Sequence, residues 1–419
     1  MNDVSKMLPP MKLGNELTDA LAVLPPITVK AEDSASDRLI ALLDIYHVFV
    51  PGRMATEIYS KLYLTLLRSL QKKNTQIAIQ QQYENLKMGM GMEAKGLFSE
   101  GISGGIDSWL LVAPSGTGKT TSISRALELI SQNQIIETKE PYSKIIPYLT
   151  VQCPHDASVK GLLYDILRKV DERLSTDYYN ISQKYNVTID LLIGTVSRVA
   201  ISSIGTLIVD EAQHLIRGSK QGQTLANFFI TFTNSTGVGL VFVGTPECNA
   251  FFQETSMQLS RRALGLTYQA LPYGVEFRNV CEKLYKYQYV QNKTQITEGI
   301  TAWLYEHTGG VVANLVTLLY SAQELAILSG REVLDMVSLR EAYDQRLTTM
   351  HQFIDNSITF QKRTSSIKSR SVILEQSAIE DGNANTDFNI ADLVRKAKLE
   401  QFDIVDLLRE RVCVEEVFV

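Results

Sequence analysis

The hydrophobic positions of the chain follow two different periods. Between residues 38 and 73 they recur at the spacing of an α-helix. The buried face predicted for this helix consists of Ile58, Leu62, Leu66 and Leu70. From Trp109 to Pro272, short apolar runs alternate with helical segments, which is typical of a parallel sheet joined by crossover helices. Beyond Pro272 the strand pattern stops and residues 275–350 show helical periodicity, so we expect an α/β core followed by a small all-helical domain.

Breaks in these patterns divide the chain into four regions. A glycine- and methionine-rich stretch over 87–107 separates the first helices from the first strand. We therefore expect a helical N-terminal extension over 1–95, an α/β core over 96–272, a helical domain over 273–354 and a C-terminal tail over 355–419. The two flanking regions carry no motif of a catalytic site, and we predict that both dock partner proteins.

Composition narrows the class of protein. The chain has 419 residues, a net charge of −5 and four cysteines, none of which forms a CxxC pair. These values argue against a basic stand-alone nucleic-acid binder, a disulfide framework and a zinc site. No run approaches the roughly 18 apolar residues of a membrane span, and the first residues lack the basic and apolar regions of a secretory signal. We expect a cytoplasmic protein that does not enter membranes.

The most specific motif is a glycine-rich loop between the first predicted strand of the α/β core and the helix after it. The loop consists of Ala113, Pro114, Ser115, Gly116, Thr117, Gly118, Lys119, Thr120 and Thr121. It fits the phosphate-loop pattern except that Ala113 replaces the first glycine. Such a loop wraps a phosphate with backbone N–H groups at a helix N-terminus, while Lys119 reaches the β- and γ-phosphates and Thr120 offers a hydroxyl to Mg²⁺. The motif predicts a nucleoside triphosphate and Mg²⁺ as cofactors.

Polar residues follow two further apolar strands. Asp210 and Glu211 end the strand LIV, where Asp210 is expected to order the Mg²⁺ shell and Glu211 to polarise an attacking water. Thr245, which follows GLVFVG, either senses the γ-phosphate or only closes a Thr-Pro turn. The pair Arg261-Arg262 either lies on a solvated helix face or supplies an arginine finger to a neighbouring subunit. Together with the phosphate loop, the two carboxylates favour a nucleotide hydrolase over a nucleotide-binding switch.

Several segments resemble those of AAA+ ATPases, namely APSGTGKTTS, LIVDEAQHL, VFVGTPE and LSRRALG followed by a helical region. They are most similar to the TnsC/TniB/MuB family of transposition regulators, especially TnsC of Tn-seven-like transposons, CRISPR-associated ones included. The N-terminal LPP and the stretch YLTVQCPHDASVKGLL also resemble this family, and the resemblance covers roughly residues 20–350. It implies Walker A at Lys119 and Thr120, Walker B at Asp210 and Glu211, sensor one at Thr245 and the finger at Arg261 or Arg262. The sequence departs from the AAA+ pattern at one position. The helical lid domain of many AAA+ ATPases carries an arginine, called sensor two, that couples the lid to the γ-phosphate, whereas GGVVANL places Asn314 near that position.

The family resemblance also implies partners. It implies ATP-dependent assembly of a homo-oligomeric ring or filament on double-stranded DNA in a bacterial cytoplasm. This assembly would link a target selector of the TniQ or TnsD type to transposase subunits of the TnsA or TnsB type, and ATP hydrolysis would dismantle it. An acidic protein must contact DNA through local positive charge. The family segment that lines the DNA channel corresponds to the region of Lys160, and weaker candidates are Lys144, Arg217 and Lys220.

Two other functions fit the same residues. A helicase loader or a replication initiator of the origin-recognition type shares the fold and the motifs, and partners at a replication fork would distinguish it. A scaffold that binds ATP without hydrolysing it is disfavoured by the intact Glu211. Measured multiple turnover would exclude such a scaffold.

Overall fold

The computed structural model describes most of the chain up to residue 347. The described residues are 4–73, 108–132, 135–137, 144–185, 187–216, 224–225, 227–229, 232–233, 236–249 and 265–347. Contacts divide the chain into two units, Met1–Ser357 and Ile358–Val419, and every described residue belongs to the first. The predicted boundary near residue 95 and the predicted tail over 355–419 lie outside the described residues.

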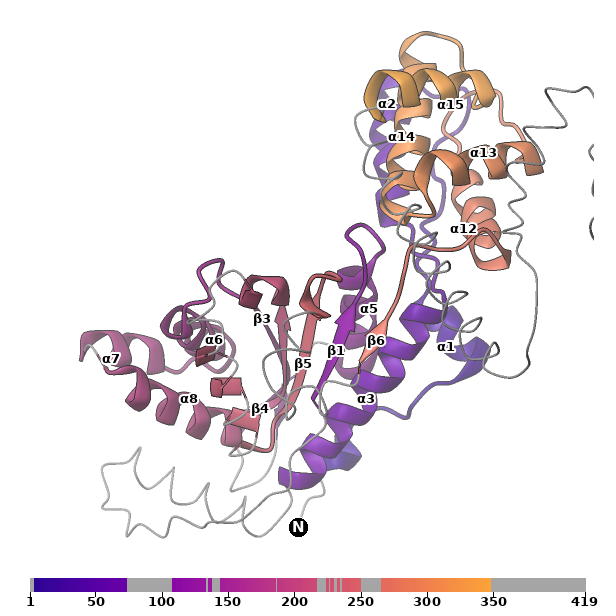
Figure 1. Cartoon of the computed structure of the whole chain (residues 1–419). Coiled ribbons are helices and arrows are strands. Elements are labelled where there is room, and N and C mark those ends of the chain that lie inside the picture. Colours follow the sequence, from indigo (N-terminus) through magenta and orange to yellow (C-terminus); the bar gives the residue numbers. More distant parts are fainter. Residues whose placement is uncertain are drawn as a thin grey trace, which may run out of the picture. The chain divides into compact units, whose positions relative to one another are not determined.

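A six-stranded sheet forms the centre of the α/β core (Figure 1). Its strands are β1 (Ser108–Val112), β2 (Ile136–Glu137), β3 (Lys144–Gln152), β4 (Ile204–Asp210), β5 (Gly239–Gly244) and β6 (Leu266–Thr267). They lie in the order β2-β3-β4-β5-β1-β6, and all neighbours are parallel except β2 and β3, which are antiparallel. The predicted parallel α/β core is therefore confirmed, and β5 lies between β1 and β4.

Successive residues of the central strands alternate between two hydrophobic cores. In β1, Trp109 and Leu111 join one core, while Leu110 and Val112 join the other. The helices of the first core are α1 (Gly14–Leu21), α3 (Arg53–Lys73) and α5 (Lys119–Ser131), and those of the second include α6 (Val159–Leu174) and α8 (Ile189–Ser203), joined by α7 (Tyr178–Lys184). Burial on both faces explains why the strands are continuous apolar runs in the sequence.

The first predicted helix is interrupted. Helix α3 confirms its predicted buried face, which consists of Ile58, Leu62, Leu66 and Leu70. Upstream lie the short 3-10 helix η1 (Val4–Met7), α2 (Ala35–Ala41) and the 3-10 helix η2 (Leu42–His47). Between η2 and α3 the chain is not helical over 48–52, because Pro51 cannot continue a helix and Phe49 pairs with Val23 in an isolated antiparallel bridge.

The helical domain has its own hydrophobic core. Its elements are α12 (Val275–Tyr285), α13 (Glu298–Thr308), α14 (Val312–Leu328), α15 (Met336–Ala342) and the π-helical turn η4 (Tyr343–Leu347). Leu42 and Ile45 of η2 belong to this core. The described part of the predicted N-terminal extension is thus shared between two cores, with α1 and α3 on the sheet and η2 in the helical domain.

The last strand, β6, is two residues long. Leu266 and Thr267 pair with β1. After Tyr268 the chain turns toward the helical domain, where the Leu271 N–H donates to the Gly310 carbonyl (3.1 Å). A Cβ on Gly310 would lie 1.9 Å from the Leu271 oxygen, and its φ of +72° also favours glycine.

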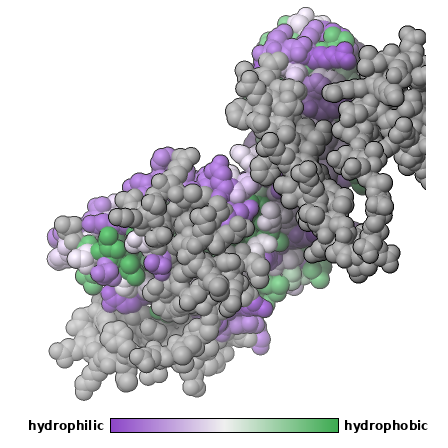
Figure 2. Space-filling model, in the orientation of Figure 1, coloured by the Kyte–Doolittle hydropathy of each residue, from purple (hydrophilic) through white to green (hydrophobic). Residues whose placement is uncertain are grey.

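Some apolar side chains remain on the surface. Ile181 of α7, together with Ile189 and Leu191 of α8, is exposed, and Figure 2 shows a hydrophobic patch at this position. No single helix within the described residues is long and apolar enough to cross a membrane. Helices α13 and α14 reach the required length only together, and they are bent by 118°.

Candidate active site

The glycine-rich loop lies between β1 and α5, as the sequence predicts. Gly116 and Gly118 have φ angles of +77° and +90°, in the left-handed region that glycine tolerates best. Helix α5 begins at Lys119, directly after this turn. Backbone N–H groups of the loop and the positive end of the α5 dipole therefore face the same space, which is the arrangement that binds phosphate.

The Lys119 ammonium is held at the base of the loop. Its Nζ donates to the carbonyl oxygens of Ala113 (2.6 Å) and Pro114 (2.9 Å). Burial lowers the pKa of Lys119, while the nearby Asp210 and Glu211 carboxylates oppose this shift. A phosphate would favour the charged form further, because an anion stabilises a buried cation.

The strand order brings the other predicted residues to the loop. Strand β5 pairs with both β1 and β4, so the carboxyl ends of all three meet at one edge of the sheet. Asp210 ends β4, and its Oδ1 accepts the Glu211 N–H (2.8 Å). Burial raises the pKa of Asp210, and this hydrogen bond opposes the shift. A cation beside this half-buried carboxylate would stabilise its ionised form.

Glu211 occupies an uncommon backbone conformation. Its φ is +58°, in the left-handed region where residues other than glycine are rare. The chain then enters the 3-10 helix η3 (Ala212–Ile216), whose Gln213 donates through Nε2 to the Glu211 carboxylate. The same Gln213 accepts the Thr245 N–H through Oε1 (3.4 Å). Sequence reasoning missed Gln213, whose only signal is its place two residues after Glu211.

Thr245 lies directly after β5, between the loop and the acidic pair. Its hydroxyl oxygen is buried and has no hydrogen-bond partner within the described part of the chain. A buried hydroxyl without a partner costs roughly 1–3 kcal/mol, so such atoms call for an explanation. A phosphate oxygen or a water held by phosphate would satisfy it.

These residues line one cavity of about 520 Å³. The predicted residues in its wall are Ser115, Gly116, Thr117, Gly118, Lys119, Thr120, Thr121, Asp210, Glu211 and Thr245. Ala113 and Pro114 are not in the wall and act through the carbonyl groups that hold Lys119. The structure therefore brings together the predicted phosphate, metal and water-activating residues.

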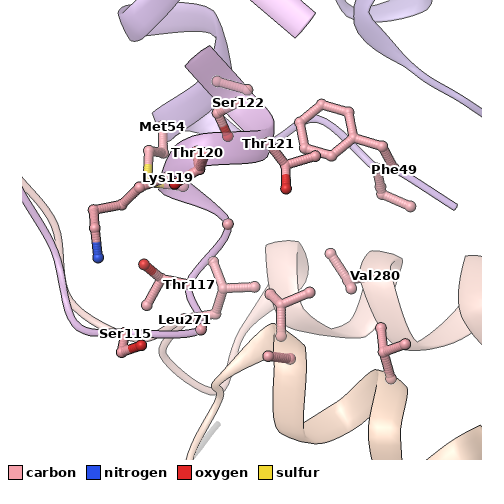
Figure 3. A pocket seen from close by; sticks show the side chains of 18 of the residues that line it. Phe49, Met54, Ser115, Thr117, Lys119, Thr120, Thr121, Ser122, Leu271 and Val280 are labelled. Atoms are coloured by element: carbon pink, nitrogen blue, oxygen red, sulfur yellow. The ribbon is translucent and has the colours of Figure 1, made fainter. Parts of the chain in front are cut away.

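The other end of the cavity is apolar, and the sequence alone did not indicate it. Its wall includes Val48, Phe49 and Val50 from the segment between η2 and α3, together with Val280 and Val316 from the helical domain. In Figure 3, Phe49 and Val280 lie on the side of the cavity away from the Lys119 ammonium. An apolar wall of this kind suits a planar base.

The helical domain also contacts the glycine-rich loop directly. The Ala313 N–H donates to the Gly116 carbonyl (3.0 Å). A Cβ on Gly116 would lie 3.0 Å from side-chain carbons of Val311 and Ala313, so glycine is required both for φ and for this approach. Asn314 is not among the described residues that line the cavity.

Among the described residues, the cavity wall carries more carboxylates than cations. Its described charged residues are Asp210, Glu211, Glu276 and Lys119, the last being the only cation among them. No group of three or more His, Cys, Asp or Glu side chains that could cage a metal occurs in the described ranges. Mg²⁺ does not need such a cage, because proteins usually hold it through one or two carboxylates while phosphates and waters supply the rest.

The candidate DNA-contacting residues lie outside the cavity wall. Lys160 is in the first turn of α6, beyond the carboxyl end of β3, and its Nζ lies 5.7 Å from the centre of the Tyr164 ring. Lys144 is exposed at the opposite end of the same strand. The nine residues of β3 place it about 26 Å from Gln152, at the carboxyl end of the strand. Arg217 and Lys220, like Arg261 and Arg262, lie outside the described residues.

The described cysteines are buried thiols rather than reactive groups. Cys153, Cys248 and Cys281 are free and buried, and burial raises the pKa of each to about 12. Thiols that remain protonated are poor nucleophiles. These three residues are therefore ordinary core thiols.

Comparisons with known proteins bear on the α/β core. A search of curated proteins found no match. Among solved structures, the chain is similar to the Aeropyrum pernix ORC1 protein in complex with DNA, at 16% identity over 65% of each chain with a TM-score of 0.41. It is also similar to Cdc6p from Pyrobaculum aerophilum, at 14% identity over 64% of this chain and 67% of that chain, with a TM-score of 0.41. A third similar structure is Drosophila ORC bound to DNA, at 14% identity over 99% of this chain and 92% of that chain, with a TM-score of 0.44.

This chain spans 65% of the length of the Aeropyrum ORC1 chain. The family model described as an AAA domain matches residues 107–252, an interval that contains the glycine-rich loop, Asp210, Glu211 and Thr245. The strand order, with β5 between the loop strand β1 and the acidic strand β4, agrees with that assignment. Residues 107–252 are therefore similar to an AAA domain, and the chain has the α/β fold of the AAA+ P-loop ATPases.

Proposed function

We propose that the protein binds Mg²⁺-ATP in the cavity between the sheet and the helical domain, which acts as its lid, and hydrolyses it. The observation that carries this proposal is that three features line one cavity. They are the glycine-rich loop, the Asp210-Glu211 pair and the buried hydroxyl of Thr245, which has no partner among the described residues. In this arrangement the loop holds the phosphates and the apolar wall around Phe49 and Val280 holds the base.

The chemistry follows from the position of each group. Thr120 and Asp210 would hold Mg²⁺, which neutralises charge on the β- and γ-phosphates when bound. Lys119 releases the two loop carbonyls and binds phosphate oxygens. Glu211 orients and deprotonates the attacking water, and the Thr245 hydroxyl donates to a γ-phosphate oxygen. Glu211 is thus the proposed general base.

We propose that a second subunit contributes a cation to this cavity. Lys119 is the only described cation in the wall, whereas a triphosphate in its transition state carries several negative charges. Arg261 or Arg262 of a neighbouring copy is our proposed finger. In that case turnover per subunit rises with protein concentration, and Arg261→Ala or Arg262→Ala removes the rise without weakening ATP binding.

Replacement of the loop lysine tests whether ATP binds in this cavity. Lys119→Ala removes the described cation in the wall, so calorimetry with ATP and Mg²⁺ is expected to show at least a tenfold loss of affinity. The matched control is Lys30→Ala, which removes an exposed lysine far from the loop in sequence and absent from the cavity wall. Equal ATP affinity for Lys119→Ala and the wild type would contradict the proposed site.

At the level of biological role, we propose a regulator of DNA transposition that assembles on double-stranded DNA with ATP. The support is the resemblance of LIVDEAQHL, VFVGTPE and LSRRALG to the TnsC/TniB/MuB family. In this role the assembly connects a TniQ- or TnsD-type target selector with TnsA- or TnsB-type transposase subunits. The alternative is a replication initiator or helicase loader with the same fold and motifs.

Electron microscopy on long DNA tests assembly, and pull-down of partners separates the two roles. A ring or filament that requires a non-hydrolysable ATP analogue supports ATP-driven assembly, and absence of DNA binding with every nucleotide would contradict both roles. Capture of a transposase subunit by the DNA-bound protein supports the transposition role. Capture of a replicative helicase instead would support the alternative.

A further inference from the structure

Glu211 is held by one side chain that also contacts the end of the neighbouring strand. Gln213 donates through Nε2 to the Glu211 carboxylate and accepts the Thr245 N–H through Oε1 (3.4 Å). Glu211 follows β4 and Thr245 follows β5, so a single amide group joins two strands that each deliver a residue to the cavity.

Only an amide of this length satisfies both contacts. The carboxylate of Glu211 needs a donor and the Thr245 backbone N–H needs an acceptor, and a glutamine side chain offers one of each. A carboxylate at residue 213 would repel Glu211, while an asparagine would be one methylene too short to reach both. The orientation of the amide follows from these partners, because the reverse orientation would place oxygen against oxygen.

The surrounding backbone makes room for this amide. A Cβ on Gly244 would lie 3.0 Å from the Gln213 Oε1 and 2.4 Å from the Cys248 Sγ. Any side chain at residue 244 would therefore push the amide away from Thr245. The absence of a side chain here lets the Gln213 amide lie against the end of β5.

The contact matters because the Gln213 amide joins two residues with proposed roles in hydrolysis, namely Glu211 as the general base and Thr245 as a ligand of the γ-phosphate. Glu211 has a left-handed backbone, which by itself does not fix the direction of its carboxylate. Thr245 presents a buried hydroxyl that has no partner among the described residues, while its N–H is bound to Gln213. A γ-phosphate that binds the hydroxyl acts on the same residue that anchors the amide.

We propose that Gln213 is a positioning residue for hydrolysis, which couples the occupancy of Thr245 by the γ-phosphate to the direction of the Glu211 carboxylate. This inference rests on the proposed ATPase function. Gln213 also lines the cavity, but in this role it acts through Glu211. Its contribution therefore appears in the chemical step rather than in ATP affinity.

Two variants of Gln213 test the proposal. Gln213→Met keeps the length of the side chain and removes both hydrogen bonds. It is expected to lower kcat about 10- to 100-fold, a part of the contribution of a well-placed general base, and to leave the Kd for ATP within twofold. Gln213→Glu replaces the donor with a second carboxylate, which repels the Glu211 carboxylate, and it is expected to lower kcat at least as far as Gln213→Met.

A glutamine with a purely structural role supplies the matched control. In the helical domain the buried Gln323 accepts the Tyr289 N–H (2.8 Å) and donates to the Tyr287 carbonyl (2.9 Å), outside the cavity wall. Gln323→Met is expected to lower the melting temperature, with kcat of the folded protein within twofold of the wild type. A loss of stability alone therefore does not reproduce the expected effect at Gln213.

The outcomes separate this inference from the function on which it rests. Wild-type protein without ATP turnover would overturn the proposed function. An active wild type with kcat of Gln213→Met within twofold of it would overturn the positioning role. That role would also be overturned by a matching loss of ATP affinity, or by a Gln213→Glu variant with the kcat of the wild type. A lower kcat at constant Kd in both Gln213 variants supports it.

Discussion

Loss of the buried Arg38 is expected to destabilise the helical domain and, through it, the wall of the cavity. The Arg38 side chain is 2% exposed and donates to Glu332 through two bonds of 2.6 and 2.7 Å. It also donates to the carbonyl oxygens of Asp33 (3.1 Å) and Tyr289 (3.0 Å). The guanidinium therefore fastens the N-terminal segment to the helical domain, ten residues before Val48, the first of the residues Val48, Phe49 and Val50 in the cavity wall.

The size of the effect follows from what Arg38→Met leaves behind. Glu332 is 13% exposed and would keep a charge without its bidentate partner. Removal of one partner from a buried ion pair costs roughly 3–5 kcal/mol, whereas removal of both partners costs much less. We therefore expect the double variant Arg38→Met/Glu332→Met to be more stable than Arg38→Met.

The two tryptophans provide the assay, because Trp109 lies in the sheet and Trp303 packs on His307 in the helical domain. Urea unfolding in a Trp109→Phe background follows the helical domain by Trp303 fluorescence. A cost below about 1 kcal/mol for Arg38→Met, or a double variant less stable than the single one, would refute the reasoning.

The pH dependence of this pair has a defined sign. Hydrogen bonding to Arg38 lowers the pKa of Glu332 below its ordinary value. The stabilisation is therefore fully present above the unfolded-state pKa and is lost as the pH falls through the lower, folded-state pKa. The difference in unfolding free energy between wild type and Arg38→Met should shrink in acid and stay constant between pH 6 and 8.

Three further predictions concern other parts of the chain. Burial lowers the pKa of Lys73 to about 7. Above that pH the unfolded state binds more protons than the folded state, so the stability of the protein rises with pH. Lys73→Met should abolish the resulting rise in melting temperature between pH 7 and 9. Lys160→Ala should weaken DNA binding across sequences and flatten its salt dependence, and an unchanged salt slope in fluorescence anisotropy would remove Lys160 from the interface. In the proposed transposition role, deletion of residues 356–419 should abolish recruitment of the transposase, measured by pull-down, while ATPase activity persists. A truncated protein that cannot bind ATP would show instead that the α/β core needs the tail.

The sequence predicted the parts of the site that local pattern determines. The loop ending in Lys119, the pair Asp210-Glu211 and Thr245 each follow a strand, and parallel strands bring their carboxyl ends to one edge. No local pattern in the sequence specifies the order of these strands, because the order depends on pairing between segments that are far apart in the chain.

Other features depended on contacts between distant segments. Phe49 entered the cavity wall because an interrupted helix and the bridge to Val23 place it there, and no motif marks this segment. Lys73, in the last turn of α3, is buried and donates to the carbonyls of Ala200 and Ile201 at the end of α8. Helical periodicity locates a face, but it does not identify the neighbour that covers it.

The central claim is that this cavity hydrolyses ATP with Glu211 as the general base. Its most direct test measures ATP affinity and steady-state phosphate release side by side in the wild type and Glu211→Gln. The account predicts equal affinity within about threefold and a loss of turnover of roughly 100-fold or more, because the amide keeps the shape of the side chain but cannot accept the proton. Turnover in Glu211→Gln equal to that of the wild type would contradict the account.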